Sequence, residues 1–345
     1  MTETPRTTSR EVRLVARPTG LPGPEHFTLI TTPRPVPAAG EVLVRNRFFL
    51  IASSLRMMIS EGAEDVPGVP FPALRPGDTL GATTLGEVVL APADSGLTPG
   101  DLLVHRRGWR EYAAVPVADC ERLDAGPADP VEAALGHGWT AYAALTRALR
   151  VEPGDTVFIT GASGAIGSMA GQIARRLGAG RVVGSAGSAA KAERLVEEFG
   201  YDAVVVRGAG PVVEQLAAAA PDGIDKCLDL VGGEQLSAAV AVANHGARIA
   251  VMGSLSGQLA ATGTGRTAPV SLDSVQLLLK RITLVGYSAD DDPQAQPEWA
   301  RTYREWREAG LISFPHQRIA GIENAVQAQL DTAAGRYLGA VVVAL

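Results

Sequence analysis

The sequence predicts an α/β protein in which a doubly wound parallel sheet is joined to a smaller β-rich domain. Two observations predict the sheet: short apolar, β-branched runs alternate with helical patterns through the middle of the chain, and a glycine-rich turn follows the first run. The third observation predicts the β-rich domain, because the N-terminal third has short strand-like runs broken by Pro and Gly. The expected sheet strands are residues 156–159, 181–185, 203–206, 224–231, 247–252 and 282–287.

The glycine-rich turn is the stretch TGASGAIGS at residues 160–168. Glycines at 161, 164 and 167 leave the backbone amides and the positive end of the following helix open to a phosphate group. Any tight strand-to-helix turn also favours glycine, so this spacing alone is weak evidence. The strand and helix alternation around it favours a dinucleotide-binding loop.

The texture of the chain changes near residue 124 and again near residue 311, where a helical stretch precedes an apolar strand at 340–344. Since the parallel sheet is complete by residue 310, we expect the C-terminal tail to return to the first domain. The expected division is one discontinuous β-rich domain, residues 1–123 and 311–345, and one nucleotide-binding domain, residues 124–310.

Composition excludes several classes of function. The net charge of −6 over 345 residues, without a basic run, argues against nucleic acid as a partner. The polar residues 1–10 are expected to form a frayed tail and not a signal or anchor, and no apolar stretch is long enough for a bilayer. Cys120 and Cys227 lie far apart without metal-ligand spacing, which favours a reducing, cytoplasmic location and no bound metal.

The second sheet strand indicates which dinucleotide binds. A carboxylate after this strand would favour NAD and repel the additional phosphate of NADP, and residues 169–190 contain no Asp or Glu. A small loop ending in Ser188 stands there instead, followed by Lys191 and, after the third strand, by Arg207. Both charges are otherwise ordinary solvated side chains, but together with the missing acid they favour NADP(H).

Several motifs, in their order and spacing, resemble those of the medium-chain dehydrogenase/reductases, most closely the zinc-independent branch of leukotriene hydroxydehydrogenases and prostaglandin reductases. The resemblance covers nearly the whole chain. The motifs are GWREY at 108–112, WTAY at 139–142, GASGAIG at 161–167, DLVGG at 229–233 and Leu338-Gly339.

This resemblance implies a GroES-like fold for the β-rich domain and a Rossmann fold for the parallel sheet. It implies NADPH-dependent reduction of the C=C bond of an α,β-unsaturated carbonyl, which we expect to be an apolar small molecule. It also implies a homodimer joined edge to edge through residues 282–287. Zinc-dependent relatives need Cys and His ligands in the first domain and a four-cysteine lobe, which this sequence lacks.

Cofactor contacts carried over from the family fall into three groups. Two positions depart from the family pattern, since Leu230 and Tyr337 stand where asparagine is expected. The implied contacts are Gly164, Ala165, Ile166 and Gly167 for the pyrophosphate; Ser188, Lys191 and Arg207 for the adenosine end; and Leu230, Gly253, Ser254, Leu255, Tyr287 and Tyr337 for the ribose and nicotinamide.

The two tyrosines that the family places near the substrate are missing. The sequence ASSLR at 52–56 replaces the usual Asp-Pro-Tyr-Met-Arg, and Gln258 replaces the second tyrosine. The enolate oxygen must then be stabilised by the cofactor ribose, by a backbone amide, or by a substitute such as Ser54 or Gln258. Arg56 is expected either to attract an acidic substrate group or to pair with a carboxylate.

Two further side chains are catalytic candidates. His137 lies between two glycines in a segment that the resemblance places near the nicotinamide, where it would donate a proton. The alternative is a histidine bonded to a neighbouring carbonyl. Tyr287 is expected to shape the pocket, with proton transfer as its second possible role.

Residues 254–271 are rich in Gly, Ala and Thr, carry one charge, Arg266, and are expected to form a mobile lid over an apolar substrate. Three other functions stay open because the tyrosines are missing. These are quinone reduction, a redox-neutral reaction such as a cyclisation, and NADPH binding without turnover.

Overall fold

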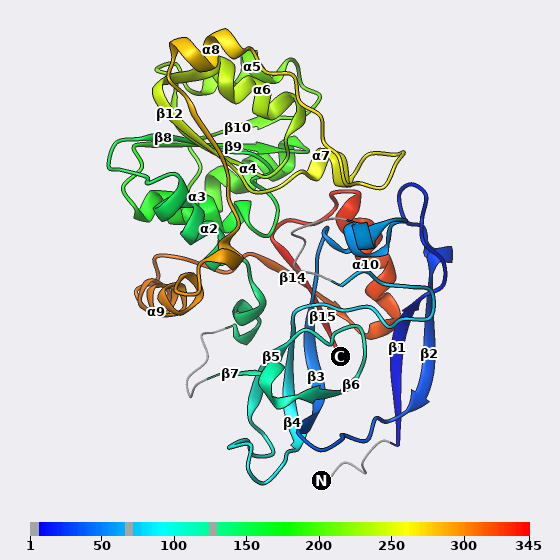
Figure 1. Ribbon diagram of the computed structural model, residues 1–345. Helices are drawn as coiled ribbons and strands as arrows, with labels where there is room; N and C mark the ends of the chain where they lie inside the picture. The colour runs from blue at the N-terminus through cyan, green and yellow to red at the C-terminus, as the bar shows by residue number, and fades with distance from the viewer. Residues whose placement is uncertain (1–6, 66–71, 124–129) are drawn as a thin grey trace.

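The computed structural model describes residues 7–65, 72–123 and 130–345, which form two large sheets in separate parts of the molecule (Figure 1). No helix in these ranges combines the length and apolar character needed to cross a bilayer. The strands are β1 Thr8–Leu14, β2 Phe27–Pro33, β3 Glu41–Ile51, β4 Thr84–Leu90, β5 Leu102–His105, β6 Tyr112–Pro116, β7 Glu121–Arg122, β8 Thr156–Ile159, β9 Arg181–Ala186, β10 Ala203–Val206, β11 Ile224–Asp229, β12 Ala243–Val251, β13 Thr283–Gly286, β14 His316–Ala320 and β15 Ala340–Ala344.

The predicted doubly wound sheet is confirmed. Its six strands run parallel in the order β10-β9-β8-β11-β12-β13, so the chain reverses its direction of winding between β8 and β11. In open parallel sheets, ligands bind at the carboxyl ends of the strands beside such a reversal. The helices of the chain are α1 Leu55–Ile59, α2 Gly138–Ala143, α3 Gly167–Arg176, α4 Ala189–Glu198, α5 Val212–Ala219, α6 Gly233–Val242, α7 Leu255–Gln258, α8 Ser274–Leu279, α9 Ala295–Glu308 and α10 Ala325–Ala333.

The strand β8 shows why this sequence forms a central strand. Its apolar residues are fully buried, with Val157 and Ile159 in one core cluster and Phe158 in another. Successive side chains of a strand point to opposite faces, so the run is apolar on both. Helices therefore cover both sides of the sheet.

The second large sheet is built from the N-terminal residues and the C-terminal tail. Its strand order is β14-β15-β3-β4-β5-β7, with β6 also paired to β3, and β1 and β2 form a separate antiparallel pair. Because β15 pairs antiparallel with β3, the tail lies within this sheet. The expected limits of the two domains stay predictions, and the one near residue 124 adjoins residues outside the described part of the chain.

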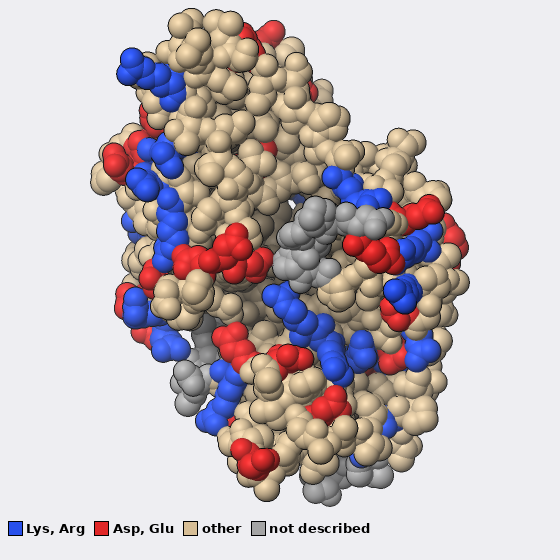
Figure 2. All heavy atoms as spheres, in the orientation of Figure 1, with Lys and Arg blue, Asp and Glu red and all other residues tan. Residues whose placement is uncertain are grey.

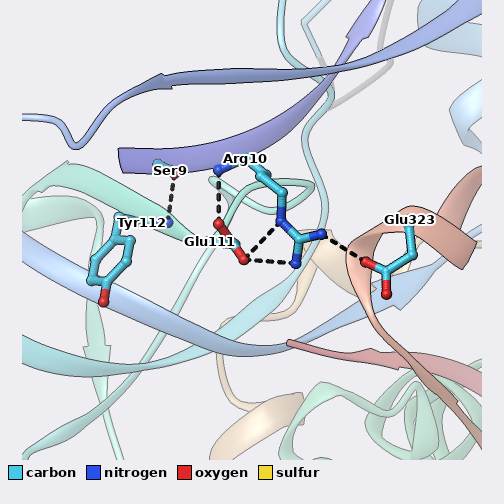
Figure 3. Close-up of polar contacts among 5 residues, drawn as sticks. All are labelled: Ser9, Arg10, Glu111, Tyr112 and Glu323. Carbon is cyan, nitrogen blue, oxygen red and sulfur yellow. Dashed lines mark hydrogen bonds and ion pairs between the residues drawn. The ribbon is translucent and has the colours of Figure 1, made fainter. Parts of the chain in front are cut away.

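The prediction that residues 1–10 form a frayed tail is wrong for residues 8–10, whereas residues 1–6 lie outside the described part of the chain. Residues 8–10 belong to β1, paired with β2, and do not form a frayed tail. The Arg10 guanidinium donates to Glu111 Oε1 at 2.9 and 3.1 Å and to Glu323 Oε2 at 3.0 Å (Figure 3). Since Glu323 precedes α10, these contacts tie the first strand to the C-terminal tail.

Candidate active site at the carboxyl edge of the parallel sheet

The residues expected in the site gather at one edge of the parallel sheet. Each of the six strands is followed within a few residues by at least one of them. Figure 2 shows that the surface is hollowed between the two parts of the molecule, with acidic atoms along one side and a row of basic atoms along the other. The predicted residues after the strands are Gly164 to Gly167 after β8, Ser188 after β9, Arg207 after β10, Leu230 after β11, Gly253 to Leu255 after β12 and Tyr287 after β13.

The turn after β8 has the shape that a phosphate needs. Gly161 has φ +61°, and a Cβ added to Gly167 would lie 2.5 Å from the Gly161 carbonyl oxygen. Both positions therefore require glycine. The Ser168 hydroxyl, in the first turn of α3, is buried and has no hydrogen-bond partner in the structure. A narrow glycine turn with an orphaned hydroxyl beside it fits the pyrophosphate of a dinucleotide.

A buried hydrogen-bond network holds this turn against the end of β11. Asp229 is fully buried and accepts hydrogen bonds from the Thr160 hydroxyl at 2.8 Å and from the Gly232 amide at 3.0 Å. The Leu230 amide in turn donates to Thr160 Oγ1 at 2.7 Å. Burial raises the pKa of Asp229, and these hydrogen bonds act against that rise. The network fixes the loops after β8 and β11 relative to each other.

The residues predicted for the adenosine end lie after β9 and β10. Ser188 begins α4, with its hydroxyl accepting from the Lys191 amide. Burial, and then the charge of Arg207, lowers the pKa of Lys191. The guanidinium of Arg207 is exposed and has no carboxylate partner in the described part of the chain, as expected for a phosphate ligand.

Lys191 has a second task that the sequence did not indicate. Its Nζ donates to the carbonyl oxygens of Gly335 and Tyr337, each at 2.5 Å. The Gly339 amide donates to the Ser163 carbonyl at 2.9 Å, so the tail passes directly beside the glycine-rich turn. Lys191 therefore also joins the parallel sheet to the β-rich domain.

The two departures from the family asparagines have distinct environments. The Leu230 carbonyl accepts from the Leu255 amide, so both of its backbone polar groups are used within the protein. The Tyr337 hydroxyl donates to Asp331 Oδ2 at 3.2 Å. A Cβ added to Gly253 would lie 2.6 Å from the Leu230 carbonyl oxygen, which explains the glycine there.

His137 precedes α2 and is held between two tightly packed glycines. A Cβ at Gly136 would lie 2.5 Å from the Phe314 ring, and a Cβ at Gly138 would lie 2.5 Å from the Trp299 ring. The His137 ring makes no hydrogen bond with the described residues, so the alternative of a bond to a neighbouring carbonyl is not found. Burial lowers the pKa of His137, with opposing effects from the charges of Asp290 and Arg106.

Tyr287 follows β13 and lies close to the loop that α2 packs against. Its hydroxyl is buried without a hydrogen-bond partner, although the side chain as a whole is half-buried. Burial, and then the nearby charge of Asp292, raises the pKa of Tyr287. The phenol is therefore neutral and available as a hydrogen-bond donor.

Gln258, one substitute for the missing tyrosines, is bonded to α1, the helix that follows the other substitute, Ser54. Ser54 lies at the start of α1, half-buried, and its hydroxyl makes no hydrogen bond with the described residues. Two residues later, Arg56 Nη1 donates to the Gln258 carbonyl oxygen, and the Gln258 side chain lies 3.8 Å from Met57 Sδ. Arg56 bonds loop carbonyls and no carboxylate in the described ranges, so the expected pairing with a carboxylate is not found, and its attraction of an acidic substrate group stays a prediction.

Comparison with known proteins agrees with this geometry. Residues 10–123 match the family model for the N-terminal domain of oxidoreductases, and residues 165–305 match that of the zinc-binding dehydrogenases. The chain is 30% identical to the NADPH-dependent curcumin reductase of Escherichia coli, over 96% of this chain and 95% of that protein. It is 28% identical to prostaglandin reductase 1 of Bos taurus, over 94% and 95% of the two chains. The chain belongs to the zinc-independent medium-chain dehydrogenase/reductases.

A solved structure gives the same assignment. The crystal structure of CurA from Vibrio vulnificus in complex with NADPH superimposes with a TM-score of 0.87 and 28% identity, over 97% of this chain and 98% of that one. This medium-chain dehydrogenase/reductase is therefore an oxidoreductase with a GroES-like domain and a Rossmann domain. Among its described residues, no group of three or more His, Cys, Asp or Glu side chains is placed to hold a metal ion.

Sequence reasoning missed two parts of this site. In the sequence, Thr160 is the first residue of the glycine-rich stretch, and nothing there indicates a role for its hydroxyl. Its hydrogen bond to Asp229 depends on the pairing of β8 with β11. The contacts of Arg56 with a loop about 200 residues away required the tertiary structure. Each signal was a polar residue beside a glycine-rich segment, which is common in loops.

Proposed function

We propose that this protein reduces the C=C bond of an α,β-unsaturated carbonyl in an apolar small molecule, with NADPH and without a metal ion. The cofactor is NADP(H), in agreement with the names of the relatives. The observation that carries the proposal is that the Tyr287 hydroxyl, which follows β13, and the His137 ring, which precedes α2, make no hydrogen bond with the described residues; the Ser54 hydroxyl, which precedes α1, makes none with them either.

When bound, NADPH supplies the hydride for the β-carbon. The glycine-rich turn and Ser168 would hold the pyrophosphate, and Ser188, Lys191 and Arg207 would hold the adenosine phosphate. These residues supply backbone amides, hydroxyls and two cations without an acidic competitor. Their task is to bind and orient, which fixes which face of the substrate reacts.

The chain itself must stabilise negative charge on the substrate oxygen and provide a proton for the α-carbon. A neutral Tyr287 phenol and a neutral His137 imidazole are hydrogen-bond donors that make no hydrogen bond with the residues that the structure describes. Donors that are already free in the protein need no reorganisation to meet a developing charge. Ser54 would supply a third donor in place of the family tyrosine.

The test is NADPH consumption with a panel of substrates: an aliphatic enal, a cyclic enone, a quinone and a saturated ketone. We expect the enal or enone to gain two hydrogen atoms at its double bond, as read by mass spectrometry, and the saturated ketone to be left unchanged. Consumption with the quinone alone would replace the proposal by quinone reduction. NADPH binding without consumption would favour a redox-neutral or non-catalytic role.

We also propose a homodimer formed through the edge strand β13, as the family resemblance implies. Leu284 on this strand is 40% exposed, and Leu278 and Leu279 on the preceding α8 are 73% and 69% exposed. Large apolar side chains exposed beside an open strand edge favour pairing with a second copy. Light scattering should give twice the chain mass, and Leu278→Glu should lower it toward that of one chain. A monomeric wild-type protein would remove this proposal.

The two cysteines fit a reducing compartment. Cys120 and Cys227 are both free thiols, and burial raises the pKa of Cys120 to about 11. Such thiols are poorly reactive and persist as small core side chains. We therefore propose a cytoplasmic location.

A further inference from the structure

We propose that Arg56 and Arg266 are positioning residues that clasp the loop 258–266 over the nucleotide cleft, each arginine binding the backbone of the segment opposite it. This inference deepens the proposed function, because the clasped loop directly follows α7 and carries Gln258. In Figure 1 the yellow segment after α7 extends toward the blue N-terminal part of the chain. Gly20 forms an isolated β-bridge with Thr262 at this junction.

Arg56 reaches from α1 into the clasped loop. Its Nη1 donates to the carbonyl oxygens of Gln258 and Ala260, the latter at 2.7 Å, and its Nη2 donates to that of Gly263 at 2.8 Å. The Arg56 side chain is only 4% exposed. The planar guanidinium therefore binds three carbonyl groups of the loop at once and fixes their positions relative to one another.

Arg266 reaches in the opposite direction, from the clasped loop to the segment after α1. Its Nη1 and Nη2 donate to the carbonyl oxygens of Gly62 and Glu61, the latter at 2.8 Å. The two arginines are matched by two glycines: a Cβ at Gly62 would lie 2.5 Å from the Arg266 guanidinium, and one at Gly265 would lie 2.9 Å from Arg56 Nε. Glycine at 62 and 265 thus lets each arginine pack flat on the opposite backbone.

The charge of Arg56 makes this contact a poor source of global stability. No carboxylate in the described ranges pairs with Arg56, and its Nε is buried without a partner. Burial lowers the pKa of Arg56, yet an arginine stays charged in proteins. The cost of taking this cation out of water offsets much of what its hydrogen bonds contribute, so we expect Arg56 to add little to the free energy of unfolding.

The geometry therefore separates a local role from a global one. If the arginines position the loop, their removal should release residues 258–266 while the rest of the fold stays intact. Release would move Gln258 and open the cleft, since Gln258 is held through its own carbonyl oxygen. Entry and exit of ligands then require the carbonyl contacts to exchange with water, as in other loop-gated sites.

The experiment is hydrogen–deuterium exchange of the full chain without ligand, read by mass spectrometry, together with the thermal unfolding midpoint. We expect Arg56→Met and Arg266→Met each to speed exchange of the amides at 258–260 by about tenfold, with nearly unchanged midpoints. The matched control is Arg194→Met, since Arg194 pairs with Glu198 within α4 and touches no loop carbonyl in the described structure. Its exchange at 258–260 should equal that of the wild type.

Arg56→Lys keeps the positive charge but loses the planar guanidinium that bonds several carbonyls at once. We expect its amides at 258–260 to exchange faster than those of the wild type and more slowly than those of Arg56→Met. Unchanged exchange at 258–260 in both Met variants would overturn the proposal. A uniform rise in exchange over the whole chain would also overturn it, because the arginines would then support the fold and not the loop. Neither readout depends on turnover, so a failure here is distinct from a failure of the reductase assignment.

Discussion

Thr160 Oγ1 lies 2.8 Å from Asp229 Oδ1 and donates its proton to it, which links the ends of the two strands between which the winding of the parallel sheet reverses. Asp229 is fully buried, and its other partners in this network are backbone amides of the turn that follows β11. One side-chain pair thus holds together the loops that follow β8 and β11.

Thr160→Val tests this link. The change removes one donor to a buried carboxylate and the acceptor for the Leu230 amide, so we expect a loss of about 2–3 kcal/mol in the free energy of unfolding. Thr160→Ser should lose much less, because it keeps the hydroxyl. Denaturant unfolding measures both, and Thr156→Val in the same strand serves as the control, since its hydroxyl bonds none of the described residues. Equal midpoints for Thr160→Val and Thr156→Val would show that the network contributes little.

Arg207→Ala tests the assignment of the additional phosphate. Loss of a charge-assisted hydrogen bond should raise the KM for NADPH by at least about tenfold and leave that for NADH almost unchanged. Lys191→Ala should act in the same direction but also disturb the tail, because Lys191 holds the carbonyls of Gly335 and Tyr337. Steady-state kinetics with both cofactors provides the comparison. The control is Arg194→Ala, because Arg194 lies on α4, the helix that carries Lys191. Equal effects on NADPH and NADH would remove the phosphate contact.

His137 gives a prediction about the pH dependence of turnover. Because burial lowers its pKa below the ordinary value, the ring is mostly neutral at pH 7 and gains its proton only in more acidic solution. If His137 supplies the proton, kcat rises as the pH falls from 7 to below about 6. This rise should disappear in His137→Gln and persist in Tyr287→Phe. Because the pKa of Tyr287 is raised, its phenol keeps its proton throughout this range. A kcat without this rise, together with a greater loss of kcat in Tyr287→Phe than in His137→Gln, would make Tyr287 the donor, and NADPH affinity should be unchanged in both variants.

A structural histidine gives a prediction about stability. His105 Nε2 lies 3.0 Å from Asn46 Oδ1, and its Nδ1 accepts the Arg107 amide at 3.0 Å. Burial, and then the charges of Arg110 and Arg107, lowers the pKa of His105 to about 3. In the unfolded chain, His105 therefore takes up a proton near pH 6.5, whereas in the folded protein it stays neutral until the pH is near 3. Its contribution to the free energy of unfolding is present above pH 6.5 and is lost as the pH falls.

The expected size is about 1 kcal/mol lost in the free energy of unfolding between pH 6 and 5. His105→Gln should be less stable at pH 7 but should lack this part of the slope. Urea unfolding at several pH values measures it, with the exposed His245→Gln as the control. If His105→Gln and wild type have the same slope, protons at other groups account for the acid sensitivity.

The sequence predicted the parts of the molecule that rest on local pattern. Residues 156–159 form a strand because their apolar run is buried on both faces, and the glycines at 161 and 167 are required by the turn that they form. These are short-range consequences of residue type. The six strands followed from the regular alternation, and the edge position of β13 from the family resemblance.

The rest depends on contacts between segments that are distant in the chain. Residues 8–10 looked like a polar tail, but pairing with β2 and the partners of Arg10 place them in a strand. Arg56 was expected either to attract an acidic substrate group or to pair with a carboxylate, and its acceptors among the described residues are neutral carbonyls of a loop about 200 residues away. The first outcome follows from strand pairing and ion pairs within the β-rich part of the molecule, and the second from contacts between α1 and a loop about 200 residues away, neither of which a local pattern encodes.

The central claim is that the carboxyl edge of the parallel sheet binds NADP(H) through the glycine-rich turn and the cations beyond it. Fluorescence titration of the purified protein with NADPH and with NADH tests this most directly. The account predicts saturable binding of NADPH that is at least about tenfold tighter than that of NADH. Equal affinities, or no binding of either nucleotide, would contradict it.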